Sequence, residues 1–146
     1  MRKVQISTGG FWASRFSFGT ASLHHIGDMA AQSALLKAAF DAGFSHFDTA
    51  PLYGFGAAER VIGQAFGASS DVTIATKVGL YPPGGCEQGR PSMLARKVGG
   101  RFLPSLSRAV ADLSVSRARE CLDGSLQRLQ REKIDLLLLH EPNAQL

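Results

Sequence analysis

The sequence predicts an α/β fold in which parallel strands alternate with helices. Four short apolar runs are rich in β-branched and aromatic residues and are bounded by glycine, proline or polar residues, which is typical of strands: 15–21, 45–49, 72–78 and 134–140. Three amphipathic segments long enough for helices lie between these runs: 28–42, 57–66 and 114–130. Because antiparallel neighbours need no helix between them, the alternation predicts a parallel sheet with right-handed crossovers.

Each predicted element carries its own boundary signals. Asp28 and Ser114 are suited to cap the first and third helices, and Gly43 and Gly67 to end the first and second. Apolar stripes at helical spacing comprise Leu35, Leu36, Ala39 and Phe40 in the first helix and Ala118, Leu122, Leu126 and Leu129 in the third. The last strand is nearly continuous in apolar residues, which is typical of a parallel strand covered on both faces. Glycines and prolines predict one long irregular connection over 81–113.

The composition is that of an ordinary globular domain. The 146 residues, 45% of them hydrophobic and 19% charged, are enough for one core. No stretch approaches the roughly 18 to 20 apolar residues of a membrane helix, and the N-terminus lacks the apolar centre of a signal peptide. The net charge of +4 is spread along the chain, which suits an anionic ligand better than nucleic acid. We therefore expect a cytoplasmic protein without membrane or nucleic-acid partners.

The cysteines and histidines give little support to a metal site. Cys86 and Cys121 lie far apart without Cys-x-x-Cys spacing, so neither a disulfide framework nor a metal knuckle is indicated, and reduced thiols are expected. His24 and His25 are adjacent but lack a third ligand at fixed spacing, so substrate contact or surface exposure is the expected role.

Three ionisable side chains are predicted to meet at one edge of the sheet. Asp48, Lys77 and His140 fall at the C-terminal ends of successive strands, the edge where parallel α/β barrels build active sites. Tyr53 follows on the loop after Asp48, at the same rim. Singly, such residues are more often a cap, a packing histidine and surface cover. However, a lysine that ends a buried run needs a carboxylate beside it, and Asp48 is the nearby candidate.

The motifs from Phe18 and Gly19 onward resemble the aldo-keto reductase superfamily. The resemblance is carried by Gly43-Phe44-Ser45-His46-Phe47-Asp48-Thr49-Ala50-Pro51-Leu52-Tyr53-Gly54, by Glu59 and Gly63, by Ala75-Thr76-Lys77-Val78-Gly79, by Ser125-Leu126-Gln127-Arg128-Leu129, by Ile134-Asp135 and by Leu138-Leu139-His140. The sequence around Asp48 and Lys77 is most similar to that of the aldose dehydrogenase and pyridoxal dehydrogenase branch.

This resemblance implies an NAD(P)-dependent oxidoreductase that interconverts a carbonyl (aldehyde, ketone or aldose) and an alcohol or lactone by hydride transfer. Tyr53 is then the general acid and base, Lys77 favours its phenolate, Asp48 holds Lys77, and His140 orients the carbonyl. Gly19, Thr20 and Asp48 lie near the nicotinamide of NADP or NAD. The loops 21–27 and 81–113 shape the substrate pocket.

The resemblance also implies the N-terminal half of a (β/α)8 barrel, with four parallel strands. A complete barrel takes about 200 to 400 residues, so we expect residues 1–146 to form one incomplete barrel domain whose second half is absent. The exposed barrel edges then allow self-association. The alternative is a truncated, non-catalytic half-barrel that serves as a binding or regulatory module, because related barrels serve as channel-associated subunits.

Overall fold

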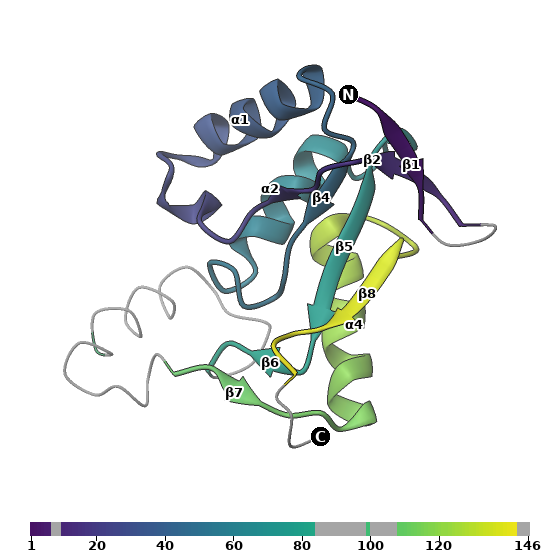
Figure 1. The fold of residues 1–146 in the computed structure, drawn as a ribbon. Helices are drawn as coiled ribbons and strands as arrows, with labels where there is room; N and C mark the ends of the chain where they lie inside the picture. Colours follow the sequence, from purple (N-terminus) through teal and green to yellow (C-terminus); the bar gives the residue numbers. More distant parts are fainter. Residues whose placement is uncertain (7–9, 84–98, 100–107, 143–146) are drawn as a thin grey trace.

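The computed structural model describes residues 1–6, 10–83, 99 and 108–142. Four of its strands form one parallel sheet (Figure 1). In spatial order they are β3 (Phe18–Gly19), β4 (His46–Asp48), β5 (Thr73–Val78) and β8 (Leu136–Leu139). Every neighbouring pair is parallel, with Asp48 opposite Ala75 and Lys77 opposite Leu138. The predicted α/β class and strand order are confirmed, although β3 spans two residues of the predicted seven.

Helices follow the strands in the predicted alternation: the short η1 (Leu23–His25), then α1 (Met29–Asp41), α2 (Ala57–Phe66) and α4 (Val115–Leu129). Both predicted N-caps are confirmed, because the Asp28 carboxylate accepts from the Ala31 amide at 2.9 Å and the Ser114 hydroxyl from the Arg117 amide at 3.4 Å. The helix α2 packs against both α1 and α4. No described helix is long and apolar enough to span a membrane.

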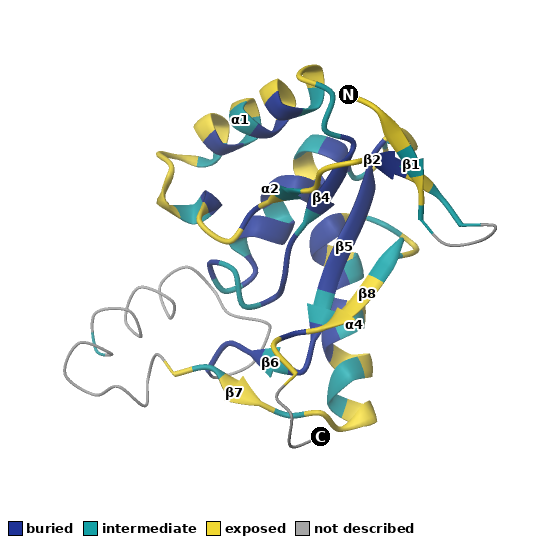
Figure 2. Cartoon of the chain, viewed as in Figure 1, coloured by how far each residue is buried: buried dark blue, intermediate teal, exposed yellow. Residues whose placement is uncertain are grey.

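The main core lies between the sheet and these helices (Figure 2). Its completely buried members are Leu36, Phe47, Val61, Ile62, Ile74 and Leu129. Gly63 allows α2 and α4 to approach closely, because a Cβ at this position would lie 2.2 Å from the carbonyl oxygen of Arg128. The strands that carry the predicted site residues therefore rest on a tightly packed layer.

Two short antiparallel pairs flank the parallel sheet. The first joins β1 (Lys3–Gln5) and β2 (Trp12–Ser14), and the second joins β6 (Leu80–Tyr81) and β7 (Val110–Ala111). The prediction of one irregular connection over 81–113 is therefore wrong at both of its ends, since strands of two residues are too short to show a period in the sequence. Residues 84–98 and 100–107 of that connection lie outside the described residues.

The strand β8 is exposed where the sequence predicts burial. Leu137, Leu138 and Leu139 are 45%, 37% and 53% exposed. Among the described strands only β5 pairs with β8, so its other edge has no neighbour there. Within the described residues β8 lacks the cover on both faces that its composition predicts and presents the exposed edge expected of an incomplete barrel, because apolar content reports a tendency to be buried and does not supply the neighbours.

Cys121 also differs from its prediction, because it is disulfide-bonded and not a reduced thiol. It is completely buried and packs with Val78 and Tyr81. The chain's other cysteine, Cys86, lies outside the described residues. Spacing along the chain misled the prediction, because disulfide formation depends on the distance between two cysteines in space.

Candidate active site

Neighbouring strand ends place the predicted residues at one rim of the sheet. Asp48 is the last residue of β4, Lys77 is the penultimate residue of β5, and His140 directly follows β8. Tyr53 lies in the turn after β4, where its amide donates to the carbonyl oxygen of Ala50 at 3.0 Å. Because the strands are parallel, all of these positions meet at the carboxyl edge of the sheet.

The Lys77 ammonium group contacts three other groups of the site through hydrogen bonds. Its Nζ donates to Asp48 Oδ1 at 2.5 Å, to the Thr49 carbonyl oxygen at 2.9 Å and to Tyr53 Oη at 3.1 Å. An ammonium group has three protons, so these three acceptors satisfy it completely. The Lys77 side chain is 12% exposed and that of Asp48 is 29% exposed, so the carboxylate offsets the desolvation of a mostly buried charge.

This arrangement leaves the Tyr53 proton available. Since Lys77 donates to the phenol oxygen, the phenol's own O–H can point to another acceptor, and the described residues provide no acceptor for it. The Lys77 Nζ also lies 4.8 Å from the centroid of the Tyr53 ring. A cation this close to the phenol oxygen is placed to stabilise negative charge that develops there during a reaction.

His140 borders the same phenol and is uncharged near neutral pH. Its ring lies 5.5 Å from the Tyr53 ring, with the two planes at 87°. Burial lowers the pKa of His140, and the positive charge of Lys77 lowers it further. A neutral imidazole keeps one N–H donor and one acceptor nitrogen, and the buried Nδ1 has no hydrogen-bond partner among the described residues. His140 can therefore offer a neutral hydrogen bond beside Tyr53.

The two predicted residues at the end of β3 differ in their surroundings. A Cβ on Gly19 would meet no atom within 4 Å, so this strand end faces open space. Thr20, by contrast, is 1% exposed, and its hydroxyl donates to the Asp48 carbonyl oxygen at 2.9 Å. The Thr20 side chain thus joins β3 to β4, while open space is found beside Gly19.

His24 and His25 lie near the rim without forming a metal cluster. Their rings are 3.9 Å apart, and a Cβ on Gly54 would lie 2.8 Å from the Cβ of His24. His24 therefore packs on the loop that carries Tyr53. Within the described residues, no group of three or more histidine, cysteine or acidic side chains is placed to hold a metal ion.

Sequence reasoning missed two parts of the surroundings. The Thr49 carbonyl is a partner of Lys77, but a backbone oxygen leaves no signal in the sequence. Glu59 and Arg128 form a buried ion pair behind the site, and their sequence separation of 69 positions hides the pairing. His46 shares a strand face with Asp48, but its Nδ1 lies 2.8 Å from the Thr73 hydroxyl, and burial lowers its pKa, so it serves as a neutral packing residue.

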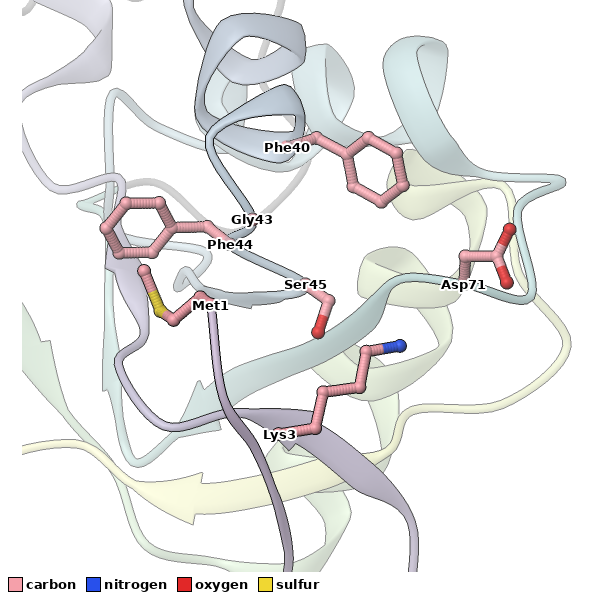
Figure 3. A pocket seen from close by; sticks show the side chains of 7 residues that line it. All are labelled: Met1, Lys3, Phe40, Gly43, Phe44, Ser45 and Asp71. Carbon is pink, nitrogen blue, oxygen red and sulfur yellow. The ribbon is translucent and has the colours of Figure 1, made fainter.

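A cavity of about 260 Å³ lies at another part of the fold, and Figure 3 shows the residues that line it. It is lined by Met1, Lys3, Phe40, Gly43, Phe44, Ser45 and Asp71. Gly43, Phe44 and Ser45 precede β4, and Asp71 precedes β5, so this cavity sits at the amino edge of the sheet. Neither Lys77 nor Tyr53 lines it, and it is separate from the candidate active site.

Comparison with known proteins agrees with the geometry. The sequence pattern of the aldo/keto reductase family matches residues 15–146. The chain belongs to the aldo/keto reductase family. Its fold is accordingly the N-terminal part of that family's (β/α)8 barrel.

Individual relatives of this aldo/keto reductase chain are oxidoreductases. It is 29% identical to pyridoxal 4-dehydrogenase of Microbacterium luteolum, covering 95% of this chain and 43% of that protein. It is 35% identical to D-threo-aldose 1-dehydrogenase of a Pseudomonas species, covering 75% and 33%. An aldo-keto reductase from Bacillus halodurans, solved in its holo form, superimposes with a TM-score of 0.74 at 28% identity, covering 99% of this chain and 42% of that structure. The chain thus spans less than half the length of these proteins.

Proposed function

We propose that this chain carries the proton-transfer centre of an NAD(P)-dependent oxidoreductase, which interconverts a carbonyl of an aldehyde, ketone or aldose and an alcohol or lactone. The observation that carries the proposal is the 3.1 Å contact between Lys77 Nζ and Tyr53 Oη, together with the 2.5 Å contact between Lys77 Nζ and Asp48 Oδ1. Membership of an oxidoreductase family and the aldose and pyridoxal dehydrogenases among the relatives support it.

In the reducing direction, Tyr53 gives its proton to the carbonyl oxygen, and in the oxidising direction its phenolate takes the proton back from the alcohol. The Lys77 ammonium group stabilises the negative charge that develops on Oη. Asp48 fixes the ammonium group, so no reorganisation is needed when this charge appears. General acid and base catalysis of this kind contributes about 10²- to 10⁴-fold in rate.

His140 is the proposed orienting donor. It is neutral, because burial and Lys77 lower its pKa, and it stands at the edge of the Tyr53 ring. A neutral N–H can bind the carbonyl oxygen without competing with Tyr53 for the role of acid. We assign to His140 the alignment of the substrate oxygen with Tyr53 Oη.

The residues present fit the nicotinamide end of a dinucleotide. The open space beside Gly19 lies at the end of β3, next to Asp48 in the strand register, and so borders the rim that holds Lys77. Gly19, Thr20 and Asp48 are the residues we propose to border the nicotinamide of NADP or NAD. When bound, such a cofactor supplies or accepts the hydride.

Replacement of Tyr53 tests the assignment. Tyr53→Phe removes only the hydroxyl and is expected to lower the rate of aldehyde or aldose reduction by NADPH or NADH by about 10²- to 10⁴-fold. Dinucleotide binding, followed through nicotinamide fluorescence, is expected to persist. Tyr81→Phe is the matched control, because Tyr81 is the second of the chain's two tyrosines and packs in a separate cluster with Val78 and Cys121. Retained turnover in Tyr53→Phe would overturn the role.

A non-catalytic binding module remains the second candidate, and the exposed β8 leucines favour it. Those side chains, and the edge of β8 that pairs with no described strand, fit a second copy of this chain that adds a strand there. The molecular mass in solution, measured on the same preparation, tests this candidate. A monomer at all concentrations would contradict self-association.

A further inference from the structure

A completely buried ion pair lies behind the candidate active site and takes no part in the proposed proton transfer. Arg128 Nε on α4 donates to Glu59 Oε2 on α2 at 2.7 Å, and the two side chains are 3% and 0% exposed. The second carboxylate oxygen, Oε1, accepts from the Thr76 hydroxyl on β5 at 2.7 Å. Arg128 Nη2 also donates to the Ser125 hydroxyl at 3.2 Å. One carboxylate therefore joins two helices and a strand.

Stability alone is a weak reason for such a pair. Removing two charges from water costs about as much as, or more than, their attraction returns, and well-packed apolar side chains at such positions are often equally or more stabilising. A carboxylate at this point does provide something that apolar contacts do not, namely two directional bonds, one from Arg128 that holds α2 on α4 and one from Thr76 that holds α2 on β5.

Both ends of this link are directly connected to proposed catalytic residues. Thr76 immediately precedes Lys77 on β5, and because side chains alternate along a strand, Thr76 faces the helices while Lys77 faces the site. Glu59 lies in the first turn of α2. The residue before it, Ala58, donates its amide to the carbonyl oxygen of Tyr53 at 3.3 Å. The bond from Glu59 to Thr76 thus ties the segment that holds Tyr53 to the strand that holds Lys77.

The start of α2 has no side-chain cap to fix it otherwise. Its N-cap is Gly56, in the left-handed conformation with φ +80°, and no side chain there accepts from the first turn. A Cβ on Gly56 would lie 2.9 Å from Cδ of Arg128, so the stem of that arginine rests on the cap residue. Glu59 and Arg128 together hold the helix start that a serine or aspartate cap would usually hold.

We propose that Glu59, held by Arg128 and Thr76, is a positioning residue that sets the separation between Tyr53 Oη and Lys77 Nζ. The inference rests on the proposed function of Tyr53 and Lys77. If the bond to Thr76 is lost, the first turn of α2 moves relative to β5, and the phenol moves relative to the ammonium group that activates it.

The test uses the whole chain and removes one bond at a time. Thr76→Val deletes the hydroxyl with little change of shape, and Thr76→Ser restores it. Glu120→Gln is the control for an ion pair without a positioning role, because Glu120 is 68% exposed and pairs with Arg117 at the helix surface. The readout is the ¹³Cζ resonance of Tyr53 in the folded chain, which Tyr53→Phe identifies, since the chain has two tyrosines. We expect it to shift in Thr76→Val and to stay in place in Thr76→Ser and Glu120→Gln.

A folded Thr76→Val chain with an unmoved Tyr53 resonance and merely a lower melting temperature would overturn the proposal, because the link would then be structural alone. If Thr76→Val does not fold, the ¹³Cζ resonance of Tyr53 is measured in Glu59→Gln instead, and a shift or its absence decides the proposal in the same way. In a preparation that reduces carbonyls, Thr76→Val is also expected to lower kcat by about 10- to 100-fold with KM unchanged. If the chain without any substitution has no reductase activity, that result counts against the proposed function. The Tyr53 resonance would still decide whether Glu59 has the positioning role.

Discussion

The neighbouring strands β5 and β8 are both rich in apolar residues, but they occupy different surroundings. The strand β5 pairs with β4 on one side and β8 on the other, and five of its six residues are buried. The strand β8 has β5 as its single described neighbour, and three of its four leucines are exposed by 37% to 53%. The difference teaches that the burial of an apolar strand is decided by its neighbours and not by its own composition.

The candidate site contains a residue of the well-packed strand β5 and one that directly follows the exposed strand β8. Lys77 comes from the well-packed strand β5 and is held by three acceptors from β4 and the loop after it. His140 follows the exposed strand β8, and its amide donates to the Val78 carbonyl oxygen at 2.8 Å. Lys77 therefore rests on the well-packed part of the sheet, while the proposed orienting histidine rests on its edge.

Truncating one side chain on each strand gives the largest expected contrast. Ile74→Ala on β5 empties a completely buried site and is expected to cost about 2 to 5 kcal/mol in free energy of unfolding. Leu139→Ala on β8, where the side chain is 53% exposed, is expected to cost about 0.5 kcal/mol or less. Urea denaturation followed by circular dichroism measures both. Equal losses would show that β8 is covered in solution, as a second copy of the chain would cover it.

The pH dependence of stability tests the exposed side of the site. Burial and the charge of Lys77 lower the pKa of His140 below that of an unfolded histidine, so the unfolded chain binds this proton more readily. The stabilisation is present above the unfolded pKa and is lost as the pH falls through the folded pKa. We expect the free energy of unfolding to fall between pH 7 and pH 5, by at most about 1.4 kcal/mol per pH unit for this one proton.

The variant His140→Gln should reduce this slope without abolishing it, because burial also lowers the pKa of His46. Denaturation curves collected across the pH range give the slope directly. An unchanged slope in His140→Gln would mean that His140 titrates in the folded chain as it does in the unfolded one.

Hydrogen exchange compares the two sides of β5 at single backbone amides. The amides of Thr49 and His140 both donate to carbonyl oxygens of β5, at 2.9 Å to Ala75 and 2.8 Å to Val78. Thr49 lies on the covered side of β5 and His140 on the edge side, so we expect the His140 amide to exchange about 10-fold faster or more. Heteronuclear spectra recorded in deuterated buffer resolve the two amides. Equal protection would show that β8 opens only together with the rest of the sheet.

Much of the site could be predicted because its residues occupy strand ends. The carboxyl ends of parallel strands meet at one edge, so Asp48, Lys77 and His140 were expected near one another once the strands were identified. The Glu59–Arg128 pair and the disulfide-bonded Cys121 could not be predicted in this way. The contact between Glu59 and Arg128 joins segments far apart in the chain, and no period in the sequence reports such a distance.

By itself, the sequence determined the alternation of strands and helices, the N-caps at Asp28 and Ser114, and the residue types at the rim, because these depend on local periodicity and on short-range hydrogen bonds. Only the tertiary structure decided that the Lys77 ammonium group divides its three protons among Asp48, Thr49 and Tyr53. It also decided that the leucines of β8 are exposed. Both outcomes depend on which groups lie next to one another in space, and a linear pattern does not contain that information.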